Sequence, residues 1–113
     1  MKEQRTLHLT LSEKPFEVMF TGEKTVEFRK ASDWIKIRLF NKDGSRKHYD
    51  VVKFTNGYGK DRPFFIAIFK GFDKASEDSV KTYSNGLEVI IKQNDFIIYL
   101  GDIIECSNIK MFF

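Results

Sequence analysis

Short apolar runs separated by turn residues are the feature that most limits how this chain can fold. Thr6–Leu11 alternates strictly, which places Leu7, Leu9 and Leu11 on one face of a strand. Phe64–Phe72 is the most apolar run, and we expect a central strand buried on both faces there. It is far shorter than the roughly 20 apolar residues of a membrane-spanning helix. The pattern predicts a β-rich domain.

The middle of the chain predicts a β-hairpin. Trp34–Phe40 alternates in polarity, which is typical of a strand. Asn41–Gly44 follows with an Asp-Gly pair, which favours a tight turn. We therefore expect His48–Phe54 to return antiparallel to Trp34–Phe40.

The last third predicts further short elements. A helical turn is expected around Ser76–Tyr83, and Leu87–Ile91 and Phe96–Leu100 are expected strands. Gly101–Asp102 is expected to turn the chain into another strand, Ile103–Ile109.

One helix is expected between the first strand and a glycine, over Ser12–Thr21. Ser12 suits its cap, Pro15 its first turn, and Gly22 its end. Its apolar residues recur at helical spacing: Phe16, Met19 and Phe20. The whole chain, residues 1–113, then reads as a single domain of the α+β class, mainly β. We expect a small barrel of about six to eight mostly antiparallel strands with one or two short helices.

The most polar strand follows this glycine, in the sequence Gly-Glu-Lys-Thr-Val-Glu-Phe-Arg. Alternation turns Val26 and Phe28 towards the core. It turns three polar side chains the other way: Thr25, Glu27 and Arg29. Lys24 is expected at the turn before the strand, free to swing over this polar face. The stretch predicts either a solvated face with a weak ion pair or a site whose cations hold an anionic or carbonyl group.

This stretch resembles the signature of the ASCH (activating-signal-cointegrator homology) domains of the PUA-like superfamily. Gly22, Lys24, Glu27 and Arg29 match its pattern G-x-K-x-x-E-x-R, and the preceding strand and helix also match, over roughly Leu7 to Arg29. The resemblance implies a PUA-like β-barrel whose cleft is lined by the motif. It also implies an RNA-binding or RNA-processing module, and one branch of the family hydrolyses N4-acylated cytidines.

A second candidate region is the loop from Asn56 to Pro63. Its two glycines allow an unusual backbone path, and its aromatic and cationic side chains can stack on a base and neutralise phosphate. A mobile connection between strands is an equal alternative. With the signature strand, the predicted ligand-binding residues are Lys24, Thr25, Glu27, Arg29, Tyr58, Lys60 and Arg62. Trp34 is a further candidate for stacking.

Composition narrows the partner classes. The net charge of +3 and a pI near 9.0 are compatible with a nucleic-acid partner. A single cysteine, Cys106, excludes an intramolecular disulfide, and His8 and His48 lie far apart without supporting ligands. We therefore expect no metal and no organic cofactor. With no signal peptide or membrane span expected, the sequence predicts a soluble cytoplasmic protein.

Three functions remain open from the sequence. The first is a module that binds RNA or a modified nucleotide in the cleft. The second is an amidohydrolase acting on N4-acylated cytidine-type nucleosides. The resemblance implies a threonine nucleophile where this chain has Glu27, so Lys24 and Glu27 would be catalytic in a variant in which Glu27 activates water. Glu88 and Glu105 are candidates for an assisting carboxylate. The third is a protein-interaction domain with a vestigial cleft.

Two effects on stability are expected from the sequence. Replacing Arg29 by alanine should lower both stability and binding, because Arg29 is expected to pair with Glu27. Replacing Lys24 by alanine should change stability by no more than about 0.5 kcal/mol, as at a surface position.

Overall fold

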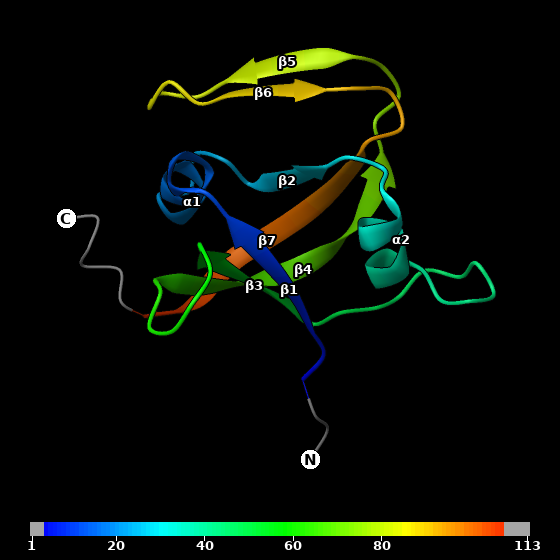
Figure 1. Cartoon of the computed structure of the whole chain (residues 1–113), viewed down its shortest axis with the longest axis horizontal. Helices are drawn as coiled ribbons and strands as arrows, with labels where there is room; N and C mark the ends of the chain where they lie inside the picture. Colours follow the sequence, from blue (N-terminus) through cyan, green and yellow to red (C-terminus); the bar gives the residue numbers. More distant parts are fainter. Residues whose placement is uncertain (1–3, 108–113) are drawn as a thin grey trace.

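A computed structural model describes residues 4–107 and shows a curled sheet that forms a half-barrel (Figure 1). The elements in chain order are β1 (Thr6–Leu11), α1 (Glu13–Phe20), β2 (Val26–Arg29), α2 (Asp33–Leu39), β3 (Val51–Asn56), β4 (Phe64–Lys74), β5 (Ser79–Thr82), β6 (Glu88–Ile91) and β7 (Phe96–Ser107). Five strands form the sheet in the order β1-β3-β4-β7-β2, and β5 and β6 form a separate two-stranded hairpin. The predicted mainly-β α+β class is confirmed.

Strand β1 and helix α1 have the predicted positions. The three leucines of β1 are buried and alternate with more exposed residues. Ser12 occupies the N-cap position of α1, although its side chain makes no capping hydrogen bond, and Pro15 lies in the first turn. Gly22 follows the end of α1 with φ of +87°, a conformation that favours glycine.

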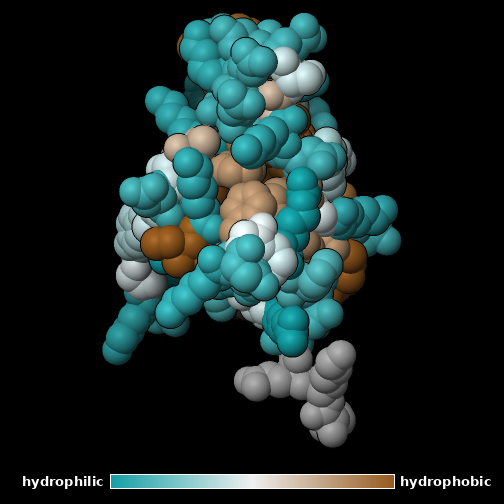
Figure 2. All heavy atoms as spheres, turned by 90° about the vertical axis from the view of Figure 1, so that its right-hand side faces the viewer, coloured by the Kyte–Doolittle hydropathy of each residue, from teal (hydrophilic) through white to brown (hydrophobic). Residues whose placement is uncertain are grey.

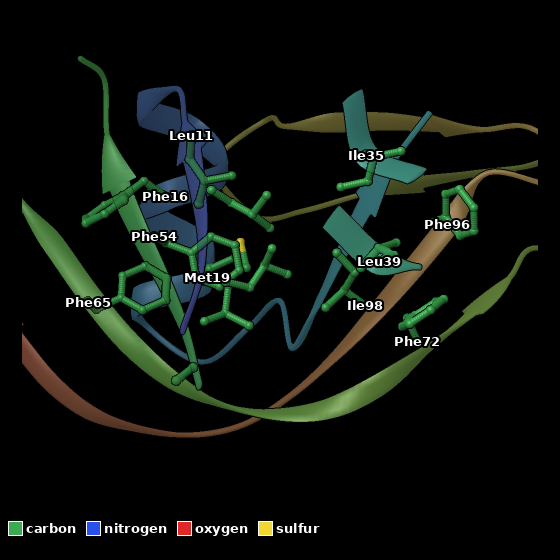
Figure 3. Close-up of a cluster of buried hydrophobic side chains, with 14 residues drawn as sticks. Leu11, Phe16, Met19, Ile35, Leu39, Phe54, Phe65, Phe72, Phe96 and Ile98 are labelled. Atoms are coloured by element: carbon green, nitrogen blue, oxygen red, sulfur yellow. The ribbon is translucent and has the colours of Figure 1, made fainter. Parts of the chain in front are cut away.

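Both helices lie on the concave side of the sheet and enclose one apolar core between them (Figure 3). Near α1, the Phe65 ring of β4 lies 5.0 Å from that of Phe16 and 5.2 Å from that of Phe54. Near α2, Phe40 makes an edge contact of 5.3 Å with Phe72. The phenylalanines fill the space between helices and sheet, as large rings do in a small core.

The strand prediction for Trp34–Phe40 is wrong, because this segment forms α2. Ile35 and Leu39, four residues apart, are both buried against the sheet, whereas Ile37 between them is exposed. Alternation and helical spacing both fit these apolar positions, and tertiary packing selects the helix. Ser32 caps the helix by accepting a hydrogen bond from the Ile35 amide.

The predicted hairpin of Trp34–Phe40 with His48–Phe54 is therefore wrong as well. Strand β3 pairs in parallel with β1 and antiparallel with β4. The Asn41–Gly44 turn does form, and beside it an isolated bridge joins Phe40 and Arg46. The parallel pairing of β3 with β1 could not be predicted from local sequence, because the two strands lie far apart in the chain and no tight turn joins them.

The helical turn predicted around Ser76–Tyr83 is also wrong. Residues Ser79–Thr82 form β5, which pairs antiparallel with β6 through a turn that contains Asn85 and Gly86. The hairpin lies beside β2 in Figure 1. Strand β5 forms because it pairs with β6, and the polar sequence of β5 alone does not indicate this pairing.

Strand β7 runs without a turn from Phe96 to Ser107, so the predicted break at Gly101–Asp102 is wrong. The register against β4 shifts there instead, which indicates a bulge. A Cβ atom on Gly101 would lie 3.1 Å from the Cβ atom of Ile68, a tight contact that favours glycine at this bulge. The predicted strand end at Ile109 lies outside the described residues.

The two helices are short. Among residues 4–107, no helix has the length and apolar character needed to cross a membrane.

The two helix caps yield a matched test of stability. Ser32→Ala removes a side-chain cap and should lower the free energy of unfolding by about 0.5–2 kcal/mol. Ser12→Ala removes no capping hydrogen bond and should stay within about 0.5 kcal/mol of the unchanged protein. Urea unfolding followed by circular dichroism measures both, and equal effects would contradict the capping role of Ser32.

Candidate functional site

Lys24 is a buried cation at the start of the signature strand. Its side chain is only 1% exposed. Its ammonium group donates to the Val26 carbonyl at 2.6 Å and to Glu27 Oε1 at 3.0 Å. A longer contact of 3.7 Å reaches the sulfur of Met19, and the ring centroid of Phe28 lies 5.3 Å away. Each of the three N–H groups of the Lys24 ammonium therefore has an acceptor: the Val26 carbonyl, the Glu27 carboxylate or the Met19 sulfur.

Glu27 is the anion at the centre of the cluster. Its Oε1 accepts from Lys24 and from the Phe28 amide at 3.2 Å. Its Oε2 accepts from Arg29 Nε at 2.9 Å and lies 2.8 Å from Arg29 Nη2. A carboxylate has about four lone-pair sites, and the donors of this cluster occupy them.

Arg29 connects the cluster to β1, the edge strand on the opposite side of the sheet. Besides contacting Glu27, its Nη2 donates to the Thr10 carbonyl of β1 at 2.8 Å. Strands β1 and β2 are the two edges of the sheet, so this side chain joins them across the open side of the half-barrel. The side chain is 23% exposed, and among residues 4–107 the N–H groups of its Nη1 atom have no hydrogen-bond partner.

Two expectations about the signature strand need correction. Glu27 was expected on an open polar face, but it is buried, whereas Val26 and Phe28 are only half-buried. Lys24 was expected to move freely, but the Glu27 carboxylate and the Val26 carbonyl fix it. The charges can be buried because they neutralise one another. The small stability effect expected for Lys24→Ala assumed a surface position, and that premise is wrong because Lys24 is buried.

A groove of about 370 Å³ lies over this cluster. The lining residues come from β1, α1, β2 and β6 and the segments between them: Thr10, Leu11, Ser12, Pro15, Lys24, Glu27, Phe28, Arg29, Lys30 and Val89. A second hollow, of about 270 Å³, lies on another side of Lys24 and includes Thr25 and Asp102. Lys24 thus separates two hollows, and Arg29 faces only one of them.

The β5–β6 hairpin is fastened beside the groove by polar contacts. The Glu23 carboxylate accepts from the Ser84 amide at 2.9 Å and from its hydroxyl at 2.7 Å. The Asn85 side chain donates to the Lys14 carbonyl at 3.0 Å. Burial raises the pKa of the Tyr83 hydroxyl, and the negative charges of Glu23 and Glu27 raise it further. Tyr83 is thus a neutral hydrogen-bonding group near the cluster.

The other predicted ligand-binding residues lie elsewhere. Tyr58 is 89% exposed, and Lys60 is exposed beside it. Arg62 donates to the Asn56 carbonyl at 2.7 Å and lines a separate hollow of about 350 Å³. Gly57 and Gly59 have positive φ, which confirms the unusual backbone path. This loop contributes no lining residue to the groove of Arg29.

The remaining candidates also lie outside the groove. Trp34 is exposed on α2, and Glu88 and Glu105 are exposed on β6 and β7. Within the described residues, no group of three or more His, Cys, Asp or Glu side chains could hold a metal ion.

Sequence reasoning missed the groove walls that come from distant elements. Leu11, Pro15 and Val89 line it, and the Thr10 carbonyl fixes Arg29. Leu11 directly precedes the predicted helix and Pro15 lies in its first turn, so both could be found by their closeness to the signature. No sequence pattern indicates the other two residues. Val89 reaches the groove only because the β5–β6 hairpin packs beside it, and Thr10 contributes a backbone carbonyl, which every residue has.

The cluster makes a prediction about stability. Glu27→Gln leaves two neighbouring cations without their anion and should cost about 3–5 kcal/mol of unfolding free energy. Lys24→Met leaves Glu27 paired with Arg29 and should cost less, about 1–3 kcal/mol. Glu105→Gln is the matched surface control, expected within about 0.5 kcal/mol. Urea unfolding checks the order, and a larger loss for Lys24→Met would contradict Glu27 as the centre.

Comparisons of the chain with protein-family models, with curated proteins and with solved structures find no match. The resemblance to ASCH domains therefore rests on Gly22, Lys24, Glu27 and Arg29 and on the strand and helix before them.

Proposed function

We propose that this protein is a binding module for a nucleotide or modified nucleotide, presented by RNA, and that the ligand lies in the groove beside Arg29. The observation that carries the proposal is the guanidinium group of Arg29. It is fixed by Glu27 and Thr10, yet its Nη1 atom has no hydrogen-bond partner among residues 4–107, and the partly exposed side chain lines the groove.

The charge of the cluster favours a ligand with an anionic or carbonyl group. Lys24 and Arg29 contribute two positive charges and Glu27 one negative charge, which leaves an excess of one positive charge. Lys30 adds another cation to the groove. A guanidinium held in a fixed orientation recognises phosphate or carbonyl oxygens well, because no further ordering is needed on binding.

The size and walls of the groove suit a base. A volume of about 370 Å³ lies in the range of small-molecule sites. Leu11, Pro15, Phe28 and Val89 supply apolar and aromatic surface opposite the charged groups. RNA recognition commonly combines such surface with charge. The resemblance to ASCH domains supports the same ligand class by a separate argument.

The geometry gives less support to hydrolysis in which Glu27 activates water. A general base needs a free lone pair directed at the proton that it accepts. Both oxygens of Glu27 already accept hydrogen bonds from the cluster and the Phe28 amide. Thr25 has an accessible side chain, but it lines the other hollow and not the groove of Arg29.

The binding proposal predicts an effect of Arg29→Lys. This change keeps the positive charge and removes the planar guanidinium group with its paired N–H donors. Affinity for cytidine 5′-monophosphate should therefore fall about tenfold or more, as expected for a lost charge-assisted hydrogen bond. Isothermal titration calorimetry measures the affinity, with cytidine as the ligand that lacks phosphate. Arg62→Lys is the matched control, because Arg62 does not line the groove, and its affinity should be unchanged.

Two results would count against the proposal. One is the absence of binding by cytidine 5′-monophosphate, cytidine and N4-acetylcytidine to the unchanged protein. The other is equal affinity in Arg29→Lys while circular dichroism shows an intact fold. Incubation with N4-acetylcytidine, followed by chromatography, should release no cytidine. Release that Lys24→Met abolishes would instead favour the amidohydrolase.

A further inference from the structure

A second charged surface lies on the side of the molecule formed by α2 and the loop that follows it. Two hollows adjoin there and share Asn41 and Lys47. The larger, about 600 Å³, is lined by Lys36, Ile37, Phe40, Asn41, Lys42 and Lys47. The smaller, about 400 Å³, is lined by Arg5, Asn41, Arg46, Lys47, His48 and Tyr49. We call this surface the basic face. It shares no lining residue with the groove of Arg29.

The excess positive charge of the chain is concentrated in this part of the sequence. Between Trp34 and His48 there are five basic side chains and one acidic side chain, which gives +4 with histidine neutral. The whole chain carries +3, so all other residues together carry −1. The slight basicity of the protein is therefore a property of this segment and not of the chain in general.

Three lysines of the basic face have no internal partner. Lys36, Lys42 and Lys47 make no ion pair and no side-chain hydrogen bond with any residue between 4 and 107. Lys24 and Lys92, by contrast, each pair with a carboxylate. Like charges gathered at one surface without counter-charges repel one another, and a polyanion relieves that repulsion.

The nearby acidic groups do not neutralise these lysines. Asp43 accepts hydrogen bonds from the amide and hydroxyl of Ser45 at 2.9 and 2.6 Å. Asp50 accepts from the Arg5 amide, and Asp73 lies 3.7 Å from Arg46. Each therefore has a partner other than these lysines.

The basic face also exposes apolar and aromatic surface. Ile37 is 66% exposed and Phe40 is half-buried, and both line the larger hollow. Figure 2 views this side and shows apolar side chains in its middle, surrounded by hydrophilic ones. Trp34 lies one helical turn before Ile37, is 45% exposed, and stacks with the Arg38 guanidinium at 3.6 Å from its ring centroid.

We propose that the basic face is a second binding site, for the phosphate backbone of single-stranded RNA, with Lys36, Lys42 and Lys47 on the phosphates and Trp34 stacking on a base. Proteins that bind single strands combine a cationic groove with exposed aromatic side chains in this way. An acidic peptide would satisfy the lysines but would make no use of the exposed tryptophan. The basic face thus adds a contact with the strand outside the nucleotide held by the groove of Arg29.

The test compares two triple variants that lower the net charge equally, from +3 to zero. The first, Lys36→Gln, Lys42→Gln and Lys47→Gln, removes the lysines of the basic face. The matched control, Lys14→Gln, Lys81→Gln and Lys92→Gln, removes exposed lysines of α1, the hairpin and the turn after it. The probe is a fluorescein-labelled 15-nucleotide oligouridylate, and its affinity is measured by anisotropy at several KCl concentrations.

The first variant should bind more weakly, and its slope of log affinity against log salt should fall by about 2, because each lost phosphate contact on a single strand contributes about 0.7. The control should keep the slope of the unchanged protein. Trp34→Ala should weaken binding about fivefold or more without changing the slope. Equal losses of slope in both triple variants would overturn the proposal, since net charge alone would then explain binding.

Two further measurements separate this proposal from the function proposed for the groove. Affinity for cytidine 5′-monophosphate should be the same in the first triple variant as in the unchanged protein. If that ligand fails to bind at all while the slope still falls, only the groove proposal fails. If the 15-nucleotide probe is displaced equally well by polyglutamate of similar charge, the basic face is a general anion surface and the proposal of an RNA site is wrong.

Discussion

The contact of Arg29 with Glu27 and with the Thr10 carbonyl is the interaction on which the site depends. The sheet begins with β1 and ends with β2, and no backbone pairing joins these two edges. The Arg29 side chain of β2 spans them with a hydrogen bond of 2.8 Å to the Thr10 carbonyl of β1, and a bond of 2.9 Å to Glu27 holds it in place. An edge that is not paired by backbone needs another form of cover, and a charged side chain can supply it. The half-barrel is thereby held together at the place where its groove opens.

Burial of this cluster makes stability depend on the same side chains as the proposed binding. Taking a lysine and a glutamate out of water is costly, and only close pairing with further hydrogen bonds compensates for the cost. Lys24 and Glu27 have that pairing in full, whereas one nitrogen of Arg29 has no partner in the part of the chain that the structure describes. The first two side chains therefore fix the third, and the third is the one available to a ligand. A rigid donor of this kind is the arrangement expected at a binding site.

The polar surface is divided between two regions with different chemistry. In the groove, the buried pair of Lys24 and Glu27 holds Arg29 in one orientation, which suits selection of a particular group. On the basic face, Lys36, Lys42 and Lys47 make no ion pair with any residue between 4 and 107, which suits contact with a nucleic-acid backbone whatever its sequence. RNA recognition commonly separates these two tasks, with phosphate contacts for affinity and a pocket for specificity. Strand β2 contributes to the groove, and helix α2, which follows it in the chain, contributes to the basic face. The short segment between β2 and α2 therefore connects the two regions.

The sequence by itself determined the elements whose pattern has a single interpretation. The leucines of β1 fit only a strand, α1 has a proline at its start and a glycine after its end, and Glu27 and Arg29 are close enough in sequence to predict their pairing. Tertiary structure decided the rest. Ile35 and Leu39 suit a strand and a helix equally, and packing chose the helix. The parallel pairing of β1 with β3, the bulge at Gly101 and the bond from Arg29 to Thr10 join residues far apart in the chain. Local patterns cannot encode such contacts, because their energy appears only when the whole sheet has formed.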